Sequence, residues 1–415
     1  MSEWVEAPLS QLATFQKGRK VDTSPFNGDG YAPYLGASGL EGGDDGFAAT
    51  PLAVIAKSTD TLMLWDGERS GLVGYGRQGV VASTVSKLSP SDKVEPKYLY
   101  YALSERFDWI QHRRTGTGVP HVPKDLGRLL KLRYPKQRTI QQRIATILTG
   151  IDTAIEKTEA LIAKYQQIKA GLMHDLFTRG VLPNGQLRPP REQAPDLYQE
   201  TAIGWIPREW DVKPLGHLCE MTSGGTPSRS IPAYWGGSIP WLKTGEIKYE
   251  DISRTEEYIT TKGLGASSAK VFPAGTIVMA MYGEGVTRGR VAILAVPCAS
   301  NQACIGFSFS NQIQTKYMYH FFEHCYEELR DLSNDGSQKN LSSGLLKQFQ
   351  IRFPTSKTEQ DCIADRLSKL DQRIASEKTY LQNLCQQKLG LMHDLLSGKV
   401  PVTIENRTTT TEAVA

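Results

Sequence analysis

The hexapeptide GLMHDL at residues 171–176 occurs a second time, letter for letter, at residues 390–395, 219 positions further along the chain. A repeat of this length in a chain of 415 residues indicates a duplicated unit. The match extends backwards, so that residues 134–181 align with residues 353–400. Identical pairs include Pro135/Pro354, Gln141/Gln360, Ile144/Ile363, Asp152/Asp371 and Ile155/Ile374.

Each copy of the repeat is predicted to be one continuous helix. Apolar residues recur every three and four positions, a proline lies just ahead of the run, and a glycine follows shortly after its end. The period is 3.5 residues, which is typical of a coiled coil. Roughly 40 residues with a rise of about 1.5 Å each give helices of about 60 Å, which we expect to act as spacers. The predicted apolar seam comprises Leu148, Ile151, Ile155, Ile162, Tyr165, Leu172, Leu176, Leu367, Leu370, Ile374, Leu381, Leu384, Leu391 and Leu395.

Polar residues interrupt the two seams at matched places. Lys169 corresponds to Lys388, and Thr158 corresponds to Glu377. A polar residue in a seam costs stability but penalises wrong registers and partners. The matched interruptions therefore suggest that the two helices pack on each other.

The sequence outside the helices also repeats, more faintly. The stretch at residues 4–12 shares Trp, Pro and two Leu residues with residues 210–218, at an offset of 206, whereas Lys97-Tyr98 and Lys316-Tyr317 return to the offset of 219. The second copy therefore carries a net insertion of 13 residues, the difference between these offsets. Short β-like runs, a helical stretch and a final strand in each copy predict an α+β fold class.

We expect six segments along the chain. A first globular domain and its spacer helix are followed by a linker, a second globular domain, a second spacer helix and a disordered tail. Their predicted ranges are 1–133, 134–180, 181–200, 201–352, 353–400 and 401–415.

The composition is that of a globular protein, with 40% hydrophobic and 22% charged residues. The formal charge of +4 would not by itself suggest nucleic acid. The first residues do not resemble a signal peptide, and no run of eighteen apolar residues occurs, so a cytoplasmic location is expected. Six cysteines without a C-x-x-C pair are expected to be buried free thiols, with no metal site.

The chain resembles the specificity subunits of type I restriction–modification systems. The resemblance rests on P-x(5)-Q-x-x-I-A, the heptads and GLM-x-D-L in both copies. The run GWIPREWDVKPL (204–215) and the run SGGTPSRSIPAYWGGSIPWLKTGEI (223–247) support it. The resemblance implies two target recognition domains and two spacer helices that pair as an antiparallel coiled coil with a pseudo-two-fold internal repeat.

The resemblance also implies a function and partners. Each target recognition domain is expected to read one half of a split, asymmetric site in double-stranded DNA, while the helices set the distance and dock two methyltransferase subunits. A translocating restriction subunit joins that complex. The chain itself is expected to have no catalytic residues and no cofactor, with S-adenosylmethionine, ATP and Mg²⁺ bound by partner subunits.

Base reading needs side chains that pair with base edges and loops that reach a groove, which Arg, Lys, Asn and Gln on loops can supply. The candidates in the first domain are Lys17, Arg19, Lys20, Arg69, Arg77, Arg113, Arg114, Thr117 and His121. Those in the second domain are Thr226, Ser228, Arg229, Lys243, Arg288, Arg290, Asn301, Gln302, Gln338, Lys339 and Asn340. Arg288 and Arg290 are expected to project together from a glycine-rich turn between strands.

Several alternatives remain open at the level of sequence. A DNA methyltransferase with an unrecognised site, a coiled-coil scaffold without a DNA role and the recognition subunit of a related type II system are the rivals. FNGDG (26–30) matches a methyl-donor loop only in its letters, because neither a buried strand before it nor a helix after it is predicted. His174 and His393 are expected to be exposed helical residues without a chemical role.

Overall fold

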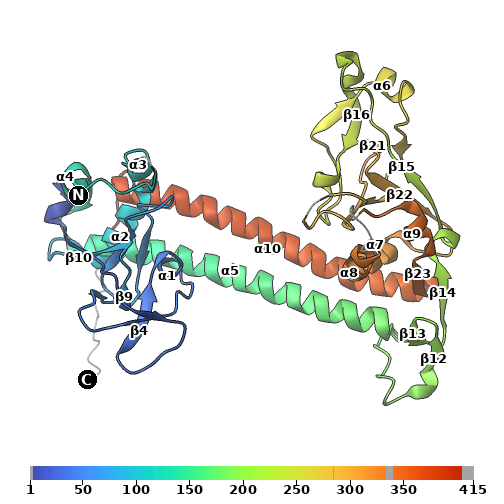
Figure 1. The fold of residues 1–415 in the computed structure, drawn as a ribbon, viewed down its shortest axis with the longest axis horizontal. Coiled ribbons are helices and arrows are strands. Elements are labelled where there is room, and N and C mark those ends of the chain that lie inside the picture. The colour runs from blue at the N-terminus through green and yellow to red at the C-terminus, as the bar shows by residue number, and fades with distance from the viewer. Residues whose placement is uncertain (1–2, 117, 284, 333–339, 404–415) are drawn as a thin grey trace, which may run out of the picture. The chain divides into compact units, whose positions relative to one another are not determined.

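The computed structural model describes residues 3–116, 118–283, 285–332 and 340–403. The chain divides into two compact units, the first made of residues 1–160 and 378–415 and the second of residues 161–377. Each unit contains one globular domain and half of each long helix, α5 (Arg138–Thr178) and α10 (Lys357–Ser397) (Figure 1). The segments predicted from the sequence differ from these units. The prediction assigned each long helix to a single segment, whereas the units divide both helices.

The two long helices have the same length, 41 residues, and begin 219 positions apart. Each begins three residues after the proline that both copies of the repeat share, because Pro135 and Pro354 still belong to strands. Each is followed by a glycine with positive φ, +64° at Gly180 and +74° at Gly398, a conformation that glycine adopts without strain and that ends helices.

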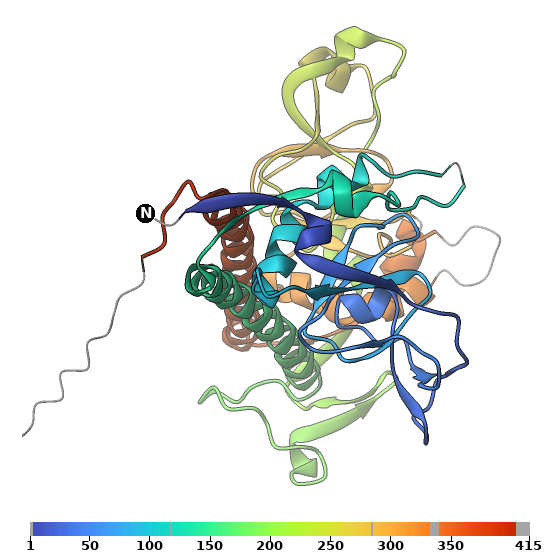
Figure 2. The ribbon, with the colours of Figure 1, turned by 90° about the vertical axis from the view of Figure 1, so that its left-hand side faces the viewer.

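Within each unit the two helix halves pack side by side in opposite directions. In the first unit Asp152 of α5 pairs with Lys388 of α10 at 2.7 Å, and α5 residues nearer its start share a core with Leu395 and Leu396. Figure 2 shows the ribbons of α5 in green and α10 in dark red side by side. In the second unit Lys169 pairs with Asp371 at 2.6 Å. All predicted seam positions are buried or half-buried, and the two lysines of one matched interruption, Lys169 and Lys388, form these ion pairs.

The first domain contains three sheets and short helices. The strand orders are β1-β11, β2-β10-β7-β8 and β3-β5-β4-β9-β6. The strands are β1 (Trp4–Pro8), β2 (Ala13–Lys17), β3 (Thr23–Ser24), β4 (Tyr31–Leu35), β5 (Phe47–Ala49), β6 (Ile55–Ala56), β7 (Thr61–Leu64), β8 (Val73–Tyr75), β9 (Gly79–Val81), β10 (Val85–Pro90) and β11 (Lys131–Pro135). The helices are α1 (Ala37–Leu40), α2 (Pro96–Glu105), α3 (Phe107–Gln111) and α4 (Leu126–Leu129).

The second domain repeats this plan. The orders β14-β23 and β15-β22-β19-β20 match two sheets of the first domain, and β17-β16-β21-β18 replaces the third. The strands are β14 (Trp210–Pro214), β15 (Cys219–Ser223), β16 (Trp235–Leu242), β17 (Glu257–Ile259), β18 (Val271–Phe272), β19 (Ile277–Ala280), β20 (Val291–Ile293), β21 (Cys298–Ser300), β22 (Cys304–Phe309) and β23 (Gln350–Pro354). The helices are α6 (Thr261–Gly265), α7 (Thr315–His324), α8 (Tyr326–Asp331) and α9 (Ser343–Gln348).

A buried glutamine joins each domain to its long helix. Gln141 donates to the carbonyls of Pro135 and Lys93 and accepts from the amide of Glu95. Gln360, 219 positions later, makes the same three bonds to Pro354, Gln312 and Gln314. Both side chains are fully buried, so three backbone groups in each unit depend on one amide.

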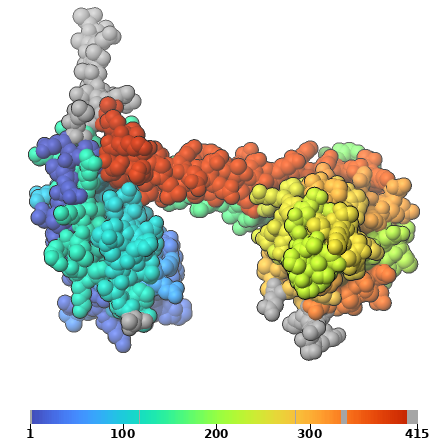
Figure 3. All heavy atoms as spheres, turned by 90° about the horizontal axis from the view of Figure 1, so that it is seen from above, coloured from blue at the N-terminus to red at the C-terminus, as the bar shows by residue number. Residues whose placement is uncertain are grey.

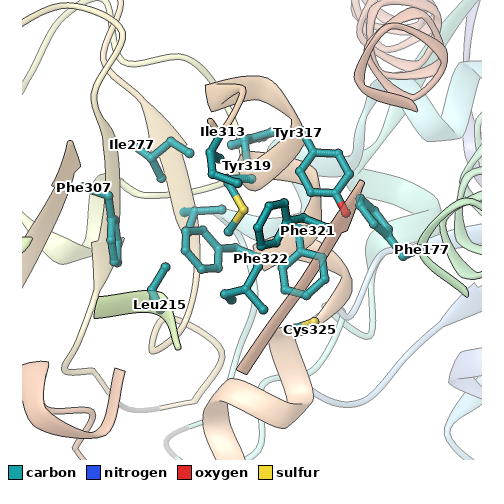
Figure 4. Packing of buried hydrophobic residues seen from close by; sticks show 14 of the residues in the cluster. Phe177, Leu215, Ile277, Phe307, Ile313, Tyr317, Tyr319, Phe321, Phe322 and Cys325 are labelled. Carbon is teal, nitrogen blue, oxygen red and sulfur yellow. The ribbon is translucent and has the colours of Figure 1, made fainter. Parts of the chain in front are cut away.

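The core of the second unit joins the domain to both helix halves. Phe321 and Phe322 of α7 and Phe307 of β22 pack together, and Phe177 of α5 packs edge-on against Tyr317 (Figure 4). Residues of α10 complete the same cluster, including Ile363 and Leu367. The second domain and the helices of this unit therefore share one apolar cluster.

Each long helix ends against the tryptophan that opens a domain. A Cβ on Gly180 would lie 2.7 Å from Trp210, and one on Gly398 would lie 2.6 Å from Trp4. These contacts require glycine at both positions. In the first unit the end of α10 therefore meets the beginning of the chain.

The expected linker is structured from residue 181 onward. Arg188 is buried and pairs with Glu359 of α10, and β12 (Tyr198–Thr201) pairs with β13 (Gly204–Pro207). The predicted disordered tail lies outside the described residues from 404 onward. In the described ranges no helix is both long and apolar enough to cross a membrane.

The cysteines are free thiols, but they are not all buried. Cys298, Cys304 and Cys325 are buried, whereas Cys385 is exposed, so the expectation of burial is wrong for Cys385. Burial raises the pKa of the Cys298 thiol to about 12. His174 and His393 are exposed, as expected. FNGDG lies between strands β3 and β4, so a strand and not a helix directly follows it, as expected.

Candidate nucleic-acid interface

The SGGTPS run places a loop tightly against the end of β21. A Cβ on Gly224 would lie 2.2 Å from the carbonyl oxygen of Ser300, and one on Gly225 would lie 2.4 Å from the amide of Ala269. Only glycine permits these approaches. Trp241 of β16 fixes the loop, because its indole Nε1 donates to the carbonyl of Gly225 at 2.9 Å.

This loop lines a hollow of about 570 Å³ in the second domain. The hollow gathers five predicted DNA-reading residues from loops far apart in sequence: Thr226, Arg229, Lys243, Asn301 and Gln302. It also contains Trp241, Thr244, Gly245, Glu246 and Glu256. Residues on and around β16 form the yellow-green face of the second domain that is turned toward the viewer in Figure 3.

Arg229 is held by aromatic rings and by a carboxylate. Its guanidinium lies 3.7 Å from the ring centroid of Trp235 and 5.0 Å from that of Trp241. Two of its nitrogens donate to Glu257 at 3.0 and 2.7 Å. The hydrogen bonds to Glu257 raise the pKa of Arg229, and the pKa of Glu257 is lowered in turn. The planar fork is therefore fixed in orientation.

Lys243 is the second cation of the hollow. Its ammonium lies 2.7 Å from Glu256, and this hydrogen bond raises the pKa of Lys243. Glu246 has a structural role, because its carboxylate accepts from the amides of Lys243 and Glu256, both at 2.8 Å. The backbone around Lys243 is thus fixed while its side chain stays at the surface.

Asn301 and Gln302 follow β21 at the edge of the hollow. The side-chain oxygen of Gln302 accepts from the Thr226 hydroxyl at 2.5 Å, which directs the Gln302 amide nitrogen away from that contact. Asn301 accepts from the amide of Ala303 at 3.1 Å. Amides with donors of this kind can pair with adenine.

The other predicted residues of the second domain lie apart from the hollow. Ser228 is exposed and contacts the hydroxyl of Ser230. Arg288 is only 6% exposed, so the expectation that it projects from the turn beside Arg290 is wrong. Arg290 is half-buried, 5.9 Å from the ring centroid of Tyr249. Asn340 is half-buried, and Gln338 and Lys339 lie outside the described residues.

In the first domain two candidates converge on a carboxylate. Lys17 of β2 lies 2.9 Å from Asp66, and His121 lies 2.7 Å from the other oxygen of the same side chain. Asp66 directly follows the strand β7 and Trp65. This cluster therefore joins β2, the end of β7 and the loop that leads to α4.

The remaining candidates of the first domain are distributed over its surface. Arg69 pairs with Glu41 at 2.6 Å, and Arg113 stacks on Trp109 at 3.9 Å. The other candidates contact neighbouring residues or are exposed to solvent. Arg19 donates to the carbonyl of Leu52, and Arg114 donates to the carbonyls of Glu68 and Gln111. Arg77 lies against Gly42, and Lys20 is exposed. Thr117 lies outside the described residues.

Sequence reasoning missed the residues that support the hollow. Trp235 and Trp241 lie an even number of positions apart on one strand, which could have indicated a shared face. Glu256 and Glu257 gave no such signal, because their role depends on the pairing of β17 with β16. Asp66 was also missed.

Relatives of the chain have the same organisation. A protein family described as "Type I restriction modification DNA specificity domain" matches residues 1–167 and 207–386. The match covers most of the chain, and the chain belongs to this family.

Two curated relatives illustrate the range of similarity. The Type I restriction enzyme MjaVIII specificity subunit of Methanocaldococcus jannaschii is 26% identical over 96% of this chain and 93% of the relative. The EcoR124I/EcoR124II specificity subunit of Escherichia coli is 27% identical over 52% of this chain and 55% of the relative.

Solved structures share the fold. The crystal structure of a type I restriction–modification S subunit from M. genitalium has a TM-score of 0.63 at 17% identity and covers 97% of both chains. A structure from a study of complex assembly in a type I system has a TM-score of 0.55 at 14% identity. The α+β class and the repeated sheet-rich domains are therefore those of this structural group.

Proposed function

We propose that this chain is the DNA specificity subunit of a type I restriction–modification system. Family membership supports the class, and the hollow of the second domain is the observation that carries the DNA-reading role. Each globular domain reads one half of a bipartite, asymmetric target. The paired helices set the distance between the halves.

The hollow has the chemistry that direct reading requires. Arg229 presents a fixed planar fork suited to guanine, and Gln302 presents an oriented amide suited to adenine. Lys243 supplies a flexible cation at the rim for a phosphate. Three kinds of contact thus converge from separate loops.

The ion pairs of the hollow can be replaced by contacts with DNA. The side chains of Arg229 and Glu257 are 52% and 32% exposed, and those of Lys243 and Glu256 are 34% and 69% exposed. Exposed pairs of this kind contribute little to stability, typically about 0–1 kcal/mol. The cations therefore stay oriented without DNA and can transfer to phosphate or guanine at small cost.

The proposed role needs partner subunits for chemistry. Two methyltransferase subunits dock on the helices and bind S-adenosylmethionine, and a translocating restriction subunit uses ATP and Mg²⁺. This chain contributes recognition and spacing but no catalytic group.

Co-purification with the methyltransferase subunit, followed by genome-wide mapping of methylated adenines, tests the proposal. The intact chain should yield a split, asymmetric motif. Replacing residues 201–352 with another recognition domain should change one half of the motif and retain the other. A complex that forms but methylates no defined motif would contradict the DNA-reading role and favour a scaffold.

A further inference from the structure

A polar cluster lies where α7 of the second domain meets both long helices. His320 and Glu323 come from α7, Asp371 from α10 and Lys169 from α5. One oxygen of Glu323 and one of Asp371 each lie 2.6 Å from the Lys169 ammonium. The second Glu323 oxygen lies 2.7 Å from the same ammonium. The proposed function uses none of these residues.

His320 is the unusual member of this cluster. Its side chain is 2% exposed, and among the described residues its Nδ1 has no hydrogen-bond partner. Its Nε2 lies 3.1 Å from the hydroxyl of Ser368, which fixes the ring. Nδ1 is therefore buried and faces the two carboxylates without a close hydrogen bond to either.

The distances suit a metal ion. Nδ1 lies 3.5 Å from Oε2 of Glu323 and 3.7 Å from Oδ2 of Asp371, and one ligand atom from each of the three residues lies within 4.8 Å of the others. Around a tetrahedral ion with bonds of about 2.0–2.2 Å, ligand atoms lie roughly 3.3–3.6 Å apart. We propose that His320, Glu323 and Asp371 bind a divalent transition-metal ion such as Zn²⁺ or Co²⁺.

Lys169 is both a neighbour and a rival of this ion. It holds both oxygens of Glu323 and Oδ1 of Asp371, so Oδ2 of Asp371 faces the imidazole and Oε2 of Glu323 would be shared between the ammonium and the ion. Its positive charge repels a second cation and so lowers the affinity. Residues that contact the ligands of a metal ion, as Lys169 does here, change how tightly the ion binds.

The first domain provides an internal comparison. The positions equivalent to His320, Glu323 and Asp371 are Tyr101, Ser104 and Asp152, with Lys388 in place of Lys169. The Tyr101 hydroxyl donates to Asp152 at 2.6 Å. A phenol and a serine hydroxyl are poor ligands for Zn²⁺ or Co²⁺, so this copy should not bind the ion. The site is therefore specific to the second unit.

Binding would tie a recognition domain to its spacer helix. Two ligands come from α7 and one from α10, so the ion crosslinks the two elements. An ion that binds only the folded chain stabilises it. The site thus strengthens the connection between the second domain and α10.

Cobalt titration of the full chain, stripped with EDTA, tests the site. Cys385→Ser serves as the background, because the exposed thiol is a competing ligand. We expect one Co²⁺ per chain, visible d–d absorption without a thiolate charge-transfer band, and a rise in Tm. His320→Gln should weaken Co²⁺ binding at least about tenfold.

Two lysine variants distinguish metal binding from a purely structural ion pair. Lys169→Gln removes the rival charge and should strengthen Co²⁺ binding at least about tenfold. Lys388→Gln, at the matched position of the first unit, should leave Co²⁺ affinity unchanged. Circular dichroism checks that each variant folds. Co²⁺ binding that is absent, or equal in His320→Gln and the background protein, would overturn the proposal.

Discussion

Helices α2 and α7 occupy the same place in the two domains and differ in an instructive way. Tyr98 and Tyr317 each donate from their hydroxyls to one backbone carbonyl, of Arg133 and Arg352, at 3.0 and 3.1 Å. Three positions further along, Tyr101 is replaced by His320. The tyrosine that bonds a backbone carbonyl is kept in both copies, whereas the position that contacts other side chains differs.

The candidate DNA-reading surfaces of the two domains differ more. The second domain has the SGGTPS loop and the hollow around Arg229, whereas the first has FQKGRKVDTSPFNG (15–28) and a cluster around Asp66. The segment between β16 and β19 is also longer than its counterpart between β4 and β7. Much of the net insertion in the second copy therefore lies beside the hollow.

The largest expected effect comes from the shared glutamines. Gln360→Leu leaves the carbonyls of Pro354 and Gln312 and the amide of Gln314 without their partner. We expect the free energy of unfolding to fall by about 3 kcal/mol or more, because unsatisfied buried groups cost about 1–3 kcal/mol each. Urea denaturation measures the change.

Gln141→Leu is the matched variant in the first unit. Because Gln141 makes the same three bonds, the two losses should be similar. A loss below about 1 kcal/mol in either unit would show that the contacts common to both copies are not what stabilises them.

The repeat explains why the helices were predictable and the sites were not. Heptad spacing sets the buried stripe of α5 and α10 locally, so the seam positions follow from sequence. Their beginnings were misplaced by a few residues because strands β11 and β23 continue through Pro135 and Pro354. Pairing with β1 and β14, which are distant in sequence, decides those boundaries.

The hollow could be predicted only in part. Polar residues on loops identified Arg229 and Gln302, but nothing local showed that they meet or that Arg288 is buried. Those outcomes depend on strands joined across the chain, such as the parallel pairing of β16 with β21. The buried His320 is separated from Asp371 by helices α8 and α9, strand β23 and the first part of α10, so the spacing in the sequence did not show that the two residues meet.

A second difference between α2 and α7 predicts a pH effect. Burial lowers the pKa of His324 from 6.5 to about 4, with Arg352 and His174 contributing, and the equivalent position in the first domain is Glu105. The unfolded chain takes up this proton near pH 6.5 and the folded chain only near pH 4. Stability is therefore lost as the pH falls through this window.

His324→Phe should remove this part of the acid sensitivity. The shift corresponds to about 2 kcal/mol after allowance for partial exposure. We expect the variant to lose less stability than the original chain between pH 7 and pH 4.5, as measured by urea unfolding at both values. Equal losses in the two proteins would show that His324 does not titrate differently in the folded state.

Arg229→Lys tests whether the hollow reads DNA. Lysine keeps the charge but cannot make the two-nitrogen contact, so affinity for the methylated motif should fall by about 1–3 kcal/mol. Competition binding of the methyltransferase complex to matched and mismatched duplexes measures it. Arg191→Lys is the control, because Arg191 stacks on Trp205 outside the hollow. Equal effects of the two variants would remove Arg229 from the recognition set.

The smallest effect on stability is expected for Arg69→Ala, so this variant can separate an effect on DNA binding from an effect on folding. Arg69 and Glu41 are each 51% exposed although they lie 2.6 Å apart. An exposed pair contributes about 0–1 kcal/mol, so Arg69→Ala should leave the urea midpoint almost unchanged. If the first domain reads DNA as the second does, the same variant should still weaken binding of the methyltransferase complex to DNA. Unchanged binding in Arg69→Ala, beside weakened binding in Arg229→Lys, would mean that the two copies present different faces to DNA.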